Sequence, residues 1–93
     1  MQIDVAVLGP DRHEAPRQVI SIGECKWGEI MGQRHLERLA RARALLAVKG
    51  FDTDSTVLAC YSGTGFDADL TDTAAKRQDV RLLGLDHLYS ATA

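Results

Sequence analysis

Glu24 and Lys26 stand two residues apart at the end of an apolar run, residues 19–27. In a β-strand, residues i and i+2 project from the same face, which would place both charges in line with Ile20 and Ile22. Burying a carboxylate and an ammonium on a central strand is costly unless they are paired, solvated or bound to a metal. The pattern therefore indicates either a functional site or a partly exposed ion pair at the end of a sheet.

Asp4 is the charge expected to join them. It lies in another short apolar run, residues 3–8, and the polar connection 9–17 contains Gly and Pro, as hairpin connections do. If the hairpin is symmetric about Glu14, Asp4 lies opposite Glu24, and directly opposed residues share a face of the sheet. A slip of one residue would move them to opposite faces, so the prediction depends on the register.

Two carboxylates and a lysine on neighbouring strands are typical of a site for a hard cation. Mg²⁺ prefers oxygen ligands, commonly one or two carboxylates with water and substrate phosphate oxygens, and the backbone carbonyl of Cys25 could add another. Lys26 could orient an attacking water and stabilise charge on a phosphate. The constellation suits metal-assisted hydrolysis of a phosphodiester.

The same residues carry a resemblance to a known family. Asp4 followed by Glu24-Cys25-Lys26 after a hairpin resembles the PD-(D/E)XK nuclease superfamily, and four segments resemble the nuclease-like C-terminal domain of predicted bacterial and archaeal AAA-type ATPases. These segments are Ile3–Ala6, Gly23–Trp27, Tyr61–Phe66 and Val80–Tyr89.

The resemblance implies a restriction-endonuclease-like fold and a nuclease that uses Mg²⁺ or Mn²⁺ on DNA. It implies metal ligation by Asp4 and Glu24 and a catalytic role for Lys26, and it suggests an ATPase as partner. The alternative is an inactive module with this fold that binds DNA or a partner ATPase without cutting.

The chain also departs from the pattern of this superfamily. The superfamily core usually begins with a helix and a strand, whereas here Asp4 follows only three residues, so we expect an N-terminally truncated version of the fold. A Gly-rich loop of the kind that binds nucleotide phosphates in ATPases is absent from the sequence.

Composition limits the other possibilities. The 93 residues predict a single domain, 1–93, and the net charge of -2 means that DNA affinity must come from a local patch such as Arg34, Arg38 and Arg41. The sequence has no signal peptide and no long apolar run, which predicts a cytoplasmic protein with no membrane association. Its two cysteines, Cys25 and Cys60, fit small buried apolar side chains rather than a zinc site.

The rest of the chain predicts an α/β fold with a mixed sheet of about four strands in chain order and flanking helices. A helix over 33–49 and a strand over 55–61 complete a right-handed βαβ unit with strand 18–27. After a Gly-rich loop we expect a helix over 66–76, and then a strand over 80–85, antiparallel at an edge.

Three further expectations concern surfaces near the site. Among the residues of the long helix, Gln33 and Arg34 should approach the charged cluster most closely. Trp27 should pack at the rim of the core, although it could instead stack on a base. The first strand is left as a sheet edge, which predicts a homodimer or larger oligomer.

Overall fold

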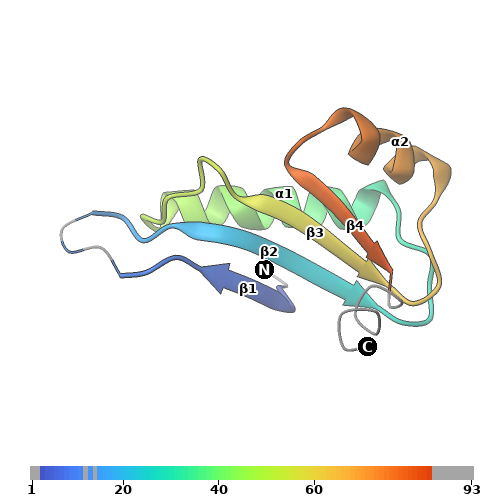
Figure 1. The fold of residues 1–93 in the computed structure, drawn as a ribbon, viewed down its shortest axis with the longest axis horizontal. Helices are drawn as coiled ribbons and strands as arrows, with labels where there is room; N and C mark the ends of the chain where they lie inside the picture. Colours follow the sequence, from blue (N-terminus) through green and yellow to red (C-terminus); the bar gives the residue numbers. More distant parts are fainter. Residues whose placement is uncertain (1–2, 12, 14, 85–93) are drawn as a thin grey trace, which may run out of the picture.

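The computed structural model describes residues 3–11, 13 and 15–84, and these form four strands and two helices. The elements are β1 (Val5–Leu8), β2 (Val19–Lys26), α1 (Gln33–Val48), β3 (Val57–Ser62), α2 (Ala68–Lys76) and β4 (Val80–Gly84). The predicted α/β architecture with a four-stranded mixed sheet is confirmed (Figure 1). The last part of the predicted strand and of the family-like segment, residues 85–89, lies outside the described residues.

The strands lie side by side in chain order, as predicted. β1 runs antiparallel to β2, and β2 and β3 are parallel. β4 is parallel to β3, so the prediction of an antiparallel last strand is wrong. The reason is the crossover: α2 carries the chain back along the sheet, so the strand that follows runs in the same direction as β3.

The core lies between the sheet and the helices. On β2, β3 and β4 the paired residues Ile22, Leu58 and Val80 are fully or almost fully buried, and they pack with Leu39 of α1 and Leu70 of α2. α1 lies behind the sheet in Figure 1. None of the described helices is long and apolar enough to cross a membrane.

Local signals set the ends of both helices. Gly50 follows α1 with a φ of +99°, a conformation that glycine adopts without a steric penalty, and its N–H donates to the carbonyl of Ala47. α2 begins after Asp67, whose carboxylate accepts a hydrogen bond from the N–H of Leu70. Asp67 is thus the N-cap of α2.

A β-bulge changes the face on which β2 begins. Val7 pairs with Ser21 but Leu8 pairs with Val19, so Ile20 is an extra residue on β2. The bulge turns Val19 into the core and leaves the Ile20 side chain 44% exposed. The prediction that Ile20 shares the buried face of Glu24 is therefore wrong, because the alternation of faces restarts after the bulge.

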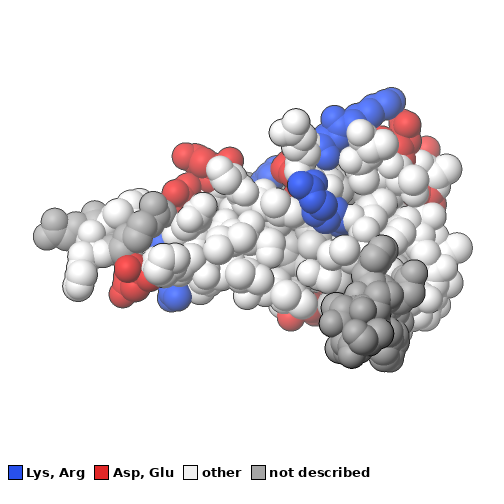
Figure 2. Space-filling view, in the orientation of Figure 1, with Lys and Arg blue, Asp and Glu red and all other residues white. Residues whose placement is uncertain are grey.

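The other face of the sheet has no described helix on it. Figure 2 views this face, and it shows mostly uncharged residues, with Lys and Arg gathered near its upper margin. Val7 on the edge strand β1 is 44% exposed there. Glu24 is instead fully buried on the helix-covered side, and the register that pairs Val5 with Gly23 places Asp4 opposite Glu24.

Candidate functional site

Glu24 is the most unusual residue of the sheet. It lies at the C-terminal end of β2, pairs with Cys60 of β3, and is fully buried on the side that α1 covers. Within residues 3–11, 13 and 15–84, neither of its carboxylate oxygens has a hydrogen-bond partner. Because an unsatisfied buried carboxylate is costly, this position calls for a compensating charge or ligand.

Two cations approach this carboxylate from different elements. Lys26 Nζ at the end of β2 lies 3.6 Å from Glu24 Oε1, and Arg38 Nη1 on α1 lies 3.4 Å from the same oxygen. These separations allow charge compensation but are longer than good hydrogen bonds. The predicted Glu24–Lys26 pair is confirmed as a contact, and Arg38 joins it.

Asp4 lies beside the same stretch of β2, as the predicted register requires. Val5 pairs with Gly23, the N–H of Asp4 donates to the Gly23 carbonyl at 2.9 Å, and Asp4 Oδ2 accepts from the N–H of Cys25 at 2.8 Å. Asp4 thus contacts the residues on both sides of Glu24. In a strand the N–H and C=O of one residue point the same way, so the Cys25 carbonyl faces the edge where Asp4 lies.

The negative charge at this site also affects the pKa values of the two cysteines. Burial, and after it the charges of Asp4 and Glu24, raise the pKa of the Cys25 thiol. Burial and Glu24 raise the pKa of Cys60 to about 11. Both side chains are free thiols, and the raised pKa disfavours the thiolate form of each. The prediction of a small buried apolar residue is confirmed for Cys60, whereas Cys25 is only half-buried.

His35 is a second buried polar residue that the sequence prediction missed. Its Nδ1 accepts a hydrogen bond from the N–H of Gly32 at 3.0 Å, which caps the start of α1. The neutral ring therefore carries its proton on Nε2. Nε2 is buried without a hydrogen bond and lies 3.9 Å from Glu29 Oε1. The signal in the sequence is that His35 falls on the same helix face as Leu39 and Ala42.

Glu29 links the buried charges to the surface. Its Oε1 lies 3.9 Å from Lys26 Nζ, and its Oε2 accepts a hydrogen bond from Arg34 at 2.8 Å. Among the described residues, Glu24 and Glu29 contact the cations Lys26, Arg34 and Arg38, and Asp4 lies on the neighbouring strand. The charges of these six described side chains sum to zero, so this set by itself does not attract a phosphate strongly.

The helix residues that reach the site differ from those predicted. Gln33 donates to Thr73 Oγ1 at 2.5 Å, which ties α1 to α2 and points Gln33 away from the charged group. Arg34 contacts only its outer edge through Glu29. Arg38, one turn further along α1, is the cation that reaches Glu24 because it lies beside the buried stripe of the helix. Arg41 is exposed.

Trp27 follows Lys26 directly and is 64% exposed, so the prediction that it packs at the rim of the core is wrong. Its backbone is nevertheless fixed, because its carbonyl accepts from Thr64 Oγ1 at 2.9 Å and the Lys26 carbonyl accepts from the N–H of Gly63 at 2.9 Å. The loop after β3 thus holds the end of β2 in place.

That loop is itself satisfied internally. Ser62 Oγ accepts hydrogen bonds from the N–H groups of Thr64 and Gly65, at 3.2 and 2.8 Å. These are the groups that would cradle a phosphate in a nucleotide-binding loop. Ser62 thus already occupies these two N–H groups, and Asp67 and Asp69 add negative charge at the start of α2.

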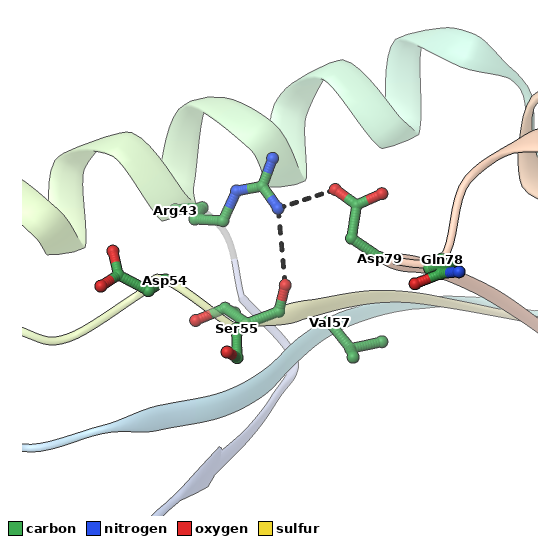
Figure 3. Close-up of a pocket in the computed structure, with 7 residues that line it drawn as sticks. Arg43, Asp54, Ser55, Val57, Gln78 and Asp79 are labelled. Carbon is green, nitrogen blue, oxygen red and sulfur yellow. Dashed lines mark hydrogen bonds and ion pairs between the residues drawn. The ribbon is translucent and has the colours of Figure 1, made fainter.

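A second charged cluster lies at the opposite ends of the parallel strands. A pocket of about 310 Å³ opens there, lined by Arg43, Asp54, Ser55, Thr56, Val57, Gln78 and Asp79 (Figure 3). Arg43 Nη1 reaches from α1 to Asp79 Oδ2 at 2.9 Å and to the Thr56 carbonyl at 3.4 Å. Arg77 makes two further bonds to Asp79, at 2.9 and 2.6 Å.

These bonds explain the electrostatics of Asp79. Hydrogen bonds from Arg77 and Arg43 hold the pKa of this carboxyl well below its usual range, and the bond to Asp79 raises the pKa of Arg77. Every contact here joins residues of the fold to one another. The ion pairs of Arg43 and Arg77 with Asp79 connect α1 to the segment before β4, and Arg43 also bonds the Thr56 carbonyl before β3.

The residues around Glu24 fit a divalent cation only if oxygen ligands other than side chains take part. Across residues 3–11, 13 and 15–84, no three His, Cys, Asp or Glu side chains are placed to hold a metal ion. Asp4, Glu24 and the Cys25 carbonyl offer two carboxylates and a backbone oxygen, the incomplete set that Mg²⁺ completes with water and phosphate. Within the described part of the chain, the two Glu24 oxygens accept no hydrogen bond.

Comparisons with known proteins provide no assignment by similarity. No family model matches the chain, and neither the curated proteins nor the solved structures include a significant match.

Proposed function

We propose that this protein is a metal-dependent nuclease-type domain that hydrolyses DNA phosphodiester bonds with Mg²⁺ or Mn²⁺. The observation that carries the proposal is the buried Glu24 carboxylate, which has no hydrogen bond on either oxygen and lies between Lys26 and the Asp4 segment. The resemblance to the PD-(D/E)XK superfamily and to its restriction-endonuclease-like fold concerns these same residues.

The roles of the residues follow from their positions. Asp4, Glu24 and the Cys25 carbonyl would hold the cation, which when bound polarises a phosphoryl oxygen and lowers the pKa of a bound water. Lys26 is 25% exposed and keeps its ammonium near Glu24, so it can hold an attacking water by hydrogen bonds and stabilise negative charge on the phosphate.

Arg38 and Lys26 are the cationic side chains that lie next to the buried Glu24 carboxylate. Since Glu24 has no exposed surface, a cation reaches it only when neighbouring side chains move. Arg38 is the better candidate because it is 35% exposed and comes from α1 rather than from the strand. Once displaced, its guanidinium could join Arg34 and Arg41 in contacting the DNA backbone.

A second candidate function is a nuclease-like module without activity that binds DNA or a partner ATPase. The observation in its favour is that Lys26 and Arg38 already compensate the charge of Glu24, so the fold does not require a metal. In this case the site would be a structural ion-pair cluster at the sheet end.

Self-association is part of either proposal. β1 is a four-residue edge strand whose Val7 and Leu8 side chains are 44% and 40% exposed, and exposed strand edges favour pairing with another chain. We expect a homodimer or larger oligomer by solution mass. A concentration-independent monomer would contradict this.

A cleavage assay separates the two functions. Wild-type protein would be incubated with single- and double-stranded DNA and Mn²⁺ or Mg²⁺, beside Glu24→Ala, Lys26→Ala and the matched control Asp79→Asn. A nuclease requires metal-dependent cutting that falls about 100-fold or more in the first two variants and stays within about twofold in the control.

Circular dichroism would establish that the variants are folded. If the wild type neither cuts DNA nor binds Mn²⁺ in calorimetry, the nuclease proposal fails and the non-enzymatic module stands.

A further inference from the structure

His35 holds a buried N–H donor that the contacts of its own helix leave unused. The side chain is 1% exposed, and its Nδ1 accepts a hydrogen bond from the N–H of Gly32 at 3.0 Å. This contact caps the start of α1 and leaves the proton of the neutral ring on Nε2. Within the described part of the chain, Nε2 donates to no acceptor. Because a buried donor without an acceptor is costly, helix capping accounts for only one of the two ring nitrogens.

Glu29 provides an acceptor beside this N–H. Its Oε1 lies 3.9 Å from His35 Nε2, and its other oxygen, Oε2, accepts a hydrogen bond from Arg34 Nη2 at 2.8 Å. Glu29 lies outside the helices and strands and is 42% exposed, so its carboxylate can move by the ~1 Å that separates this contact from a hydrogen bond. A metal ion does not suit this place, because Nε2 carries a proton where a metal needs a lone pair.

The same oxygen of Glu29 contacts Lys26. Glu29 Oε1 lies 3.9 Å from Lys26 Nζ, and Glu24 Oε1 lies 3.6 Å from it. The ammonium of Lys26 therefore lies near two carboxylates, one fully buried and one partly exposed. In the proposed function the Glu24 oxygens serve a cation, and Glu29 is then the carboxylate that keeps Lys26 in place. Since a lysine ammonium is a point charge on a flexible stem, its position depends on such a partner.

We propose that His35 is a positioning residue for Lys26 and acts through Glu29. His35 donates its Nε2–H to Glu29 Oε1, and the oriented carboxylate holds the Lys26 ammonium where it can contact a phosphate. The phosphate in this statement rests on the proposed function, whereas the arrangement of the three side chains belongs to the protein without metal or DNA. Because His35 is buried, it does not contact the DNA itself.

Two amide variants separate the ring nitrogens of His35. In His35→Asn the side-chain oxygen replaces Nδ1 as the acceptor for Gly32, but no donor remains at the place of Nε2. In His35→Gln the amide NH₂ replaces Nε2–H as the donor, but the acceptor for Gly32 is lost. A purely structural role at the start of α1 predicts that His35→Asn is the milder change in every measurement. The positioning role predicts the opposite order wherever Lys26 is measured.

Carbon NMR of protein labelled with ¹³C at lysine Cε measures the surroundings of Lys26 without metal or DNA. The chain has three lysines, and Lys26→Ala identifies the signal of Lys26. We expect this signal to shift in His35→Asn and in Glu29→Gln, and to stay close to its wild-type position in His35→Gln. Thermal unfolding should show the reverse order, with the Tm of His35→Gln below that of His35→Asn. Glu37→Gln, at an exposed position of α1, is the control and should change neither quantity.

The cleavage assay measures the consequence for hydrolysis. His35→Asn should lower kcat about 10- to 100-fold with little change in KM for DNA, and His35→Gln should stay within about threefold of the wild type. Glu29→Gln should lower kcat at least as far as His35→Asn. The double variant should equal Glu29→Gln, because the two residues act as one unit.

The outcomes separate this inference from the proposed function. A Lys26 signal that responds to neither His35 variant, or to His35→Gln at least as much as to His35→Asn, would overturn the positioning role. Metal-dependent cleavage whose kcat is lowest in His35→Gln would overturn it as well, yet leave the nuclease proposal intact. The expected Lys26 shifts in a protein that never cuts would support the positioning of Lys26 and refute the nuclease.

Discussion

Two carboxylates, Asp79 and Glu24, each lie between two cations at opposite ends of the parallel strands, and they differ in how far their bonding is satisfied. Asp79 makes three side-chain bonds of 2.6 to 2.9 Å to Arg77 and Arg43. Glu24 is fully buried, yet its nearest cation atoms are 3.4 and 3.6 Å away and neither oxygen has a hydrogen bond.

The difference distinguishes a structural ion-pair cluster from a candidate ligand-binding site. A charge whose bonds are all made by the protein has little capacity left for a ligand, even beside a pocket of about 310 Å³. A buried carboxylate with unused acceptor capacity retains a cost that a ligand can remove. Pocket volume as a criterion would locate a ligand site at the Asp79 end of the sheet. Unsatisfied hydrogen-bonding capacity locates it at the Glu24 end instead.

The largest effect expected is on stabilisation by metal. Mn²⁺ at about 100 times its dissociation constant should stabilise the wild type by about 2.7 kcal/mol, which raises the Tm of a domain this size by roughly 10 °C or more. Glu24→Gln should abolish this shift, and Asp79→Asn should keep it, as measured by differential scanning calorimetry. If Mn²⁺ raises the Tm of Glu24→Gln as much as that of the wild type, the metal binds elsewhere. The Glu24 end of the sheet would then not differ from the Asp79 end in metal binding.

The next effect concerns Arg38, which competes with a cation for Glu24. Arg38→Gln should lower the free energy of unfolding of the metal-free protein by about 1–2 kcal/mol, because Glu24 loses one of its two compensating charges. It should also tighten Mn²⁺ binding by about tenfold, because a positive charge next to the metal is removed. Urea unfolding and isothermal titration calorimetry measure the two quantities.

Arg34→Gln is the matched control for this change. Arg34 lies on the same helix but is 71% exposed and pairs with Glu29 instead of Glu24, so Mn²⁺ affinity should stay within about twofold. Weaker Mn²⁺ binding by Arg38→Gln would show that Arg38 supports the metal site and does not compete with it.

The smallest effect is the pH dependence contributed by Asp79. Its pKa is lower in the folded protein than in the unfolded chain, so the stability it provides is present above about pH 4 and is lost as the pH falls below that value. Since Asp79 is about one-third exposed, the contribution is about 1 kcal/mol. Asp79→Asn should lack this part of the acid-induced loss in urea unfolding between pH 7 and pH 3.

The control for that measurement is Asp72→Asn. Asp72 bonds to Lys76 across one turn of α2, and both side chains are largely exposed, so its removal should change stability by less than about 0.5 kcal/mol. If Asp72→Asn reduces the acid-induced loss as much as Asp79→Asn does, the doubly paired Asp79 has no special role.

Sequence periodicity and turn chemistry identified the four strands, the two helices and their order, because these depend on neighbours a few residues apart. The symmetric hairpin predicted that Asp4 would meet the Glu24 segment, and the i, i+2 spacing predicted the Glu24–Lys26 contact. Asp67 as a cap and Gly50 at the helix end were equally local. The bulge at Ile20 escaped this reasoning, since alternation assumes an unbroken ladder.

The tertiary structure alone decided which side chains converge on Glu24. Arg38 reaches Glu24, and His35 reaches Glu29, because α1 packs against β2, and the orientation of a helix on a sheet depends on the whole core. The same packing directs the Gln33 side chain to a hydrogen bond with α2 and leaves the Trp27 side chain exposed to solvent. Residue types and spacing fixed the candidate chemistry, whereas long-range packing fixed its surroundings, because burial and charge balance are properties of the assembled fold.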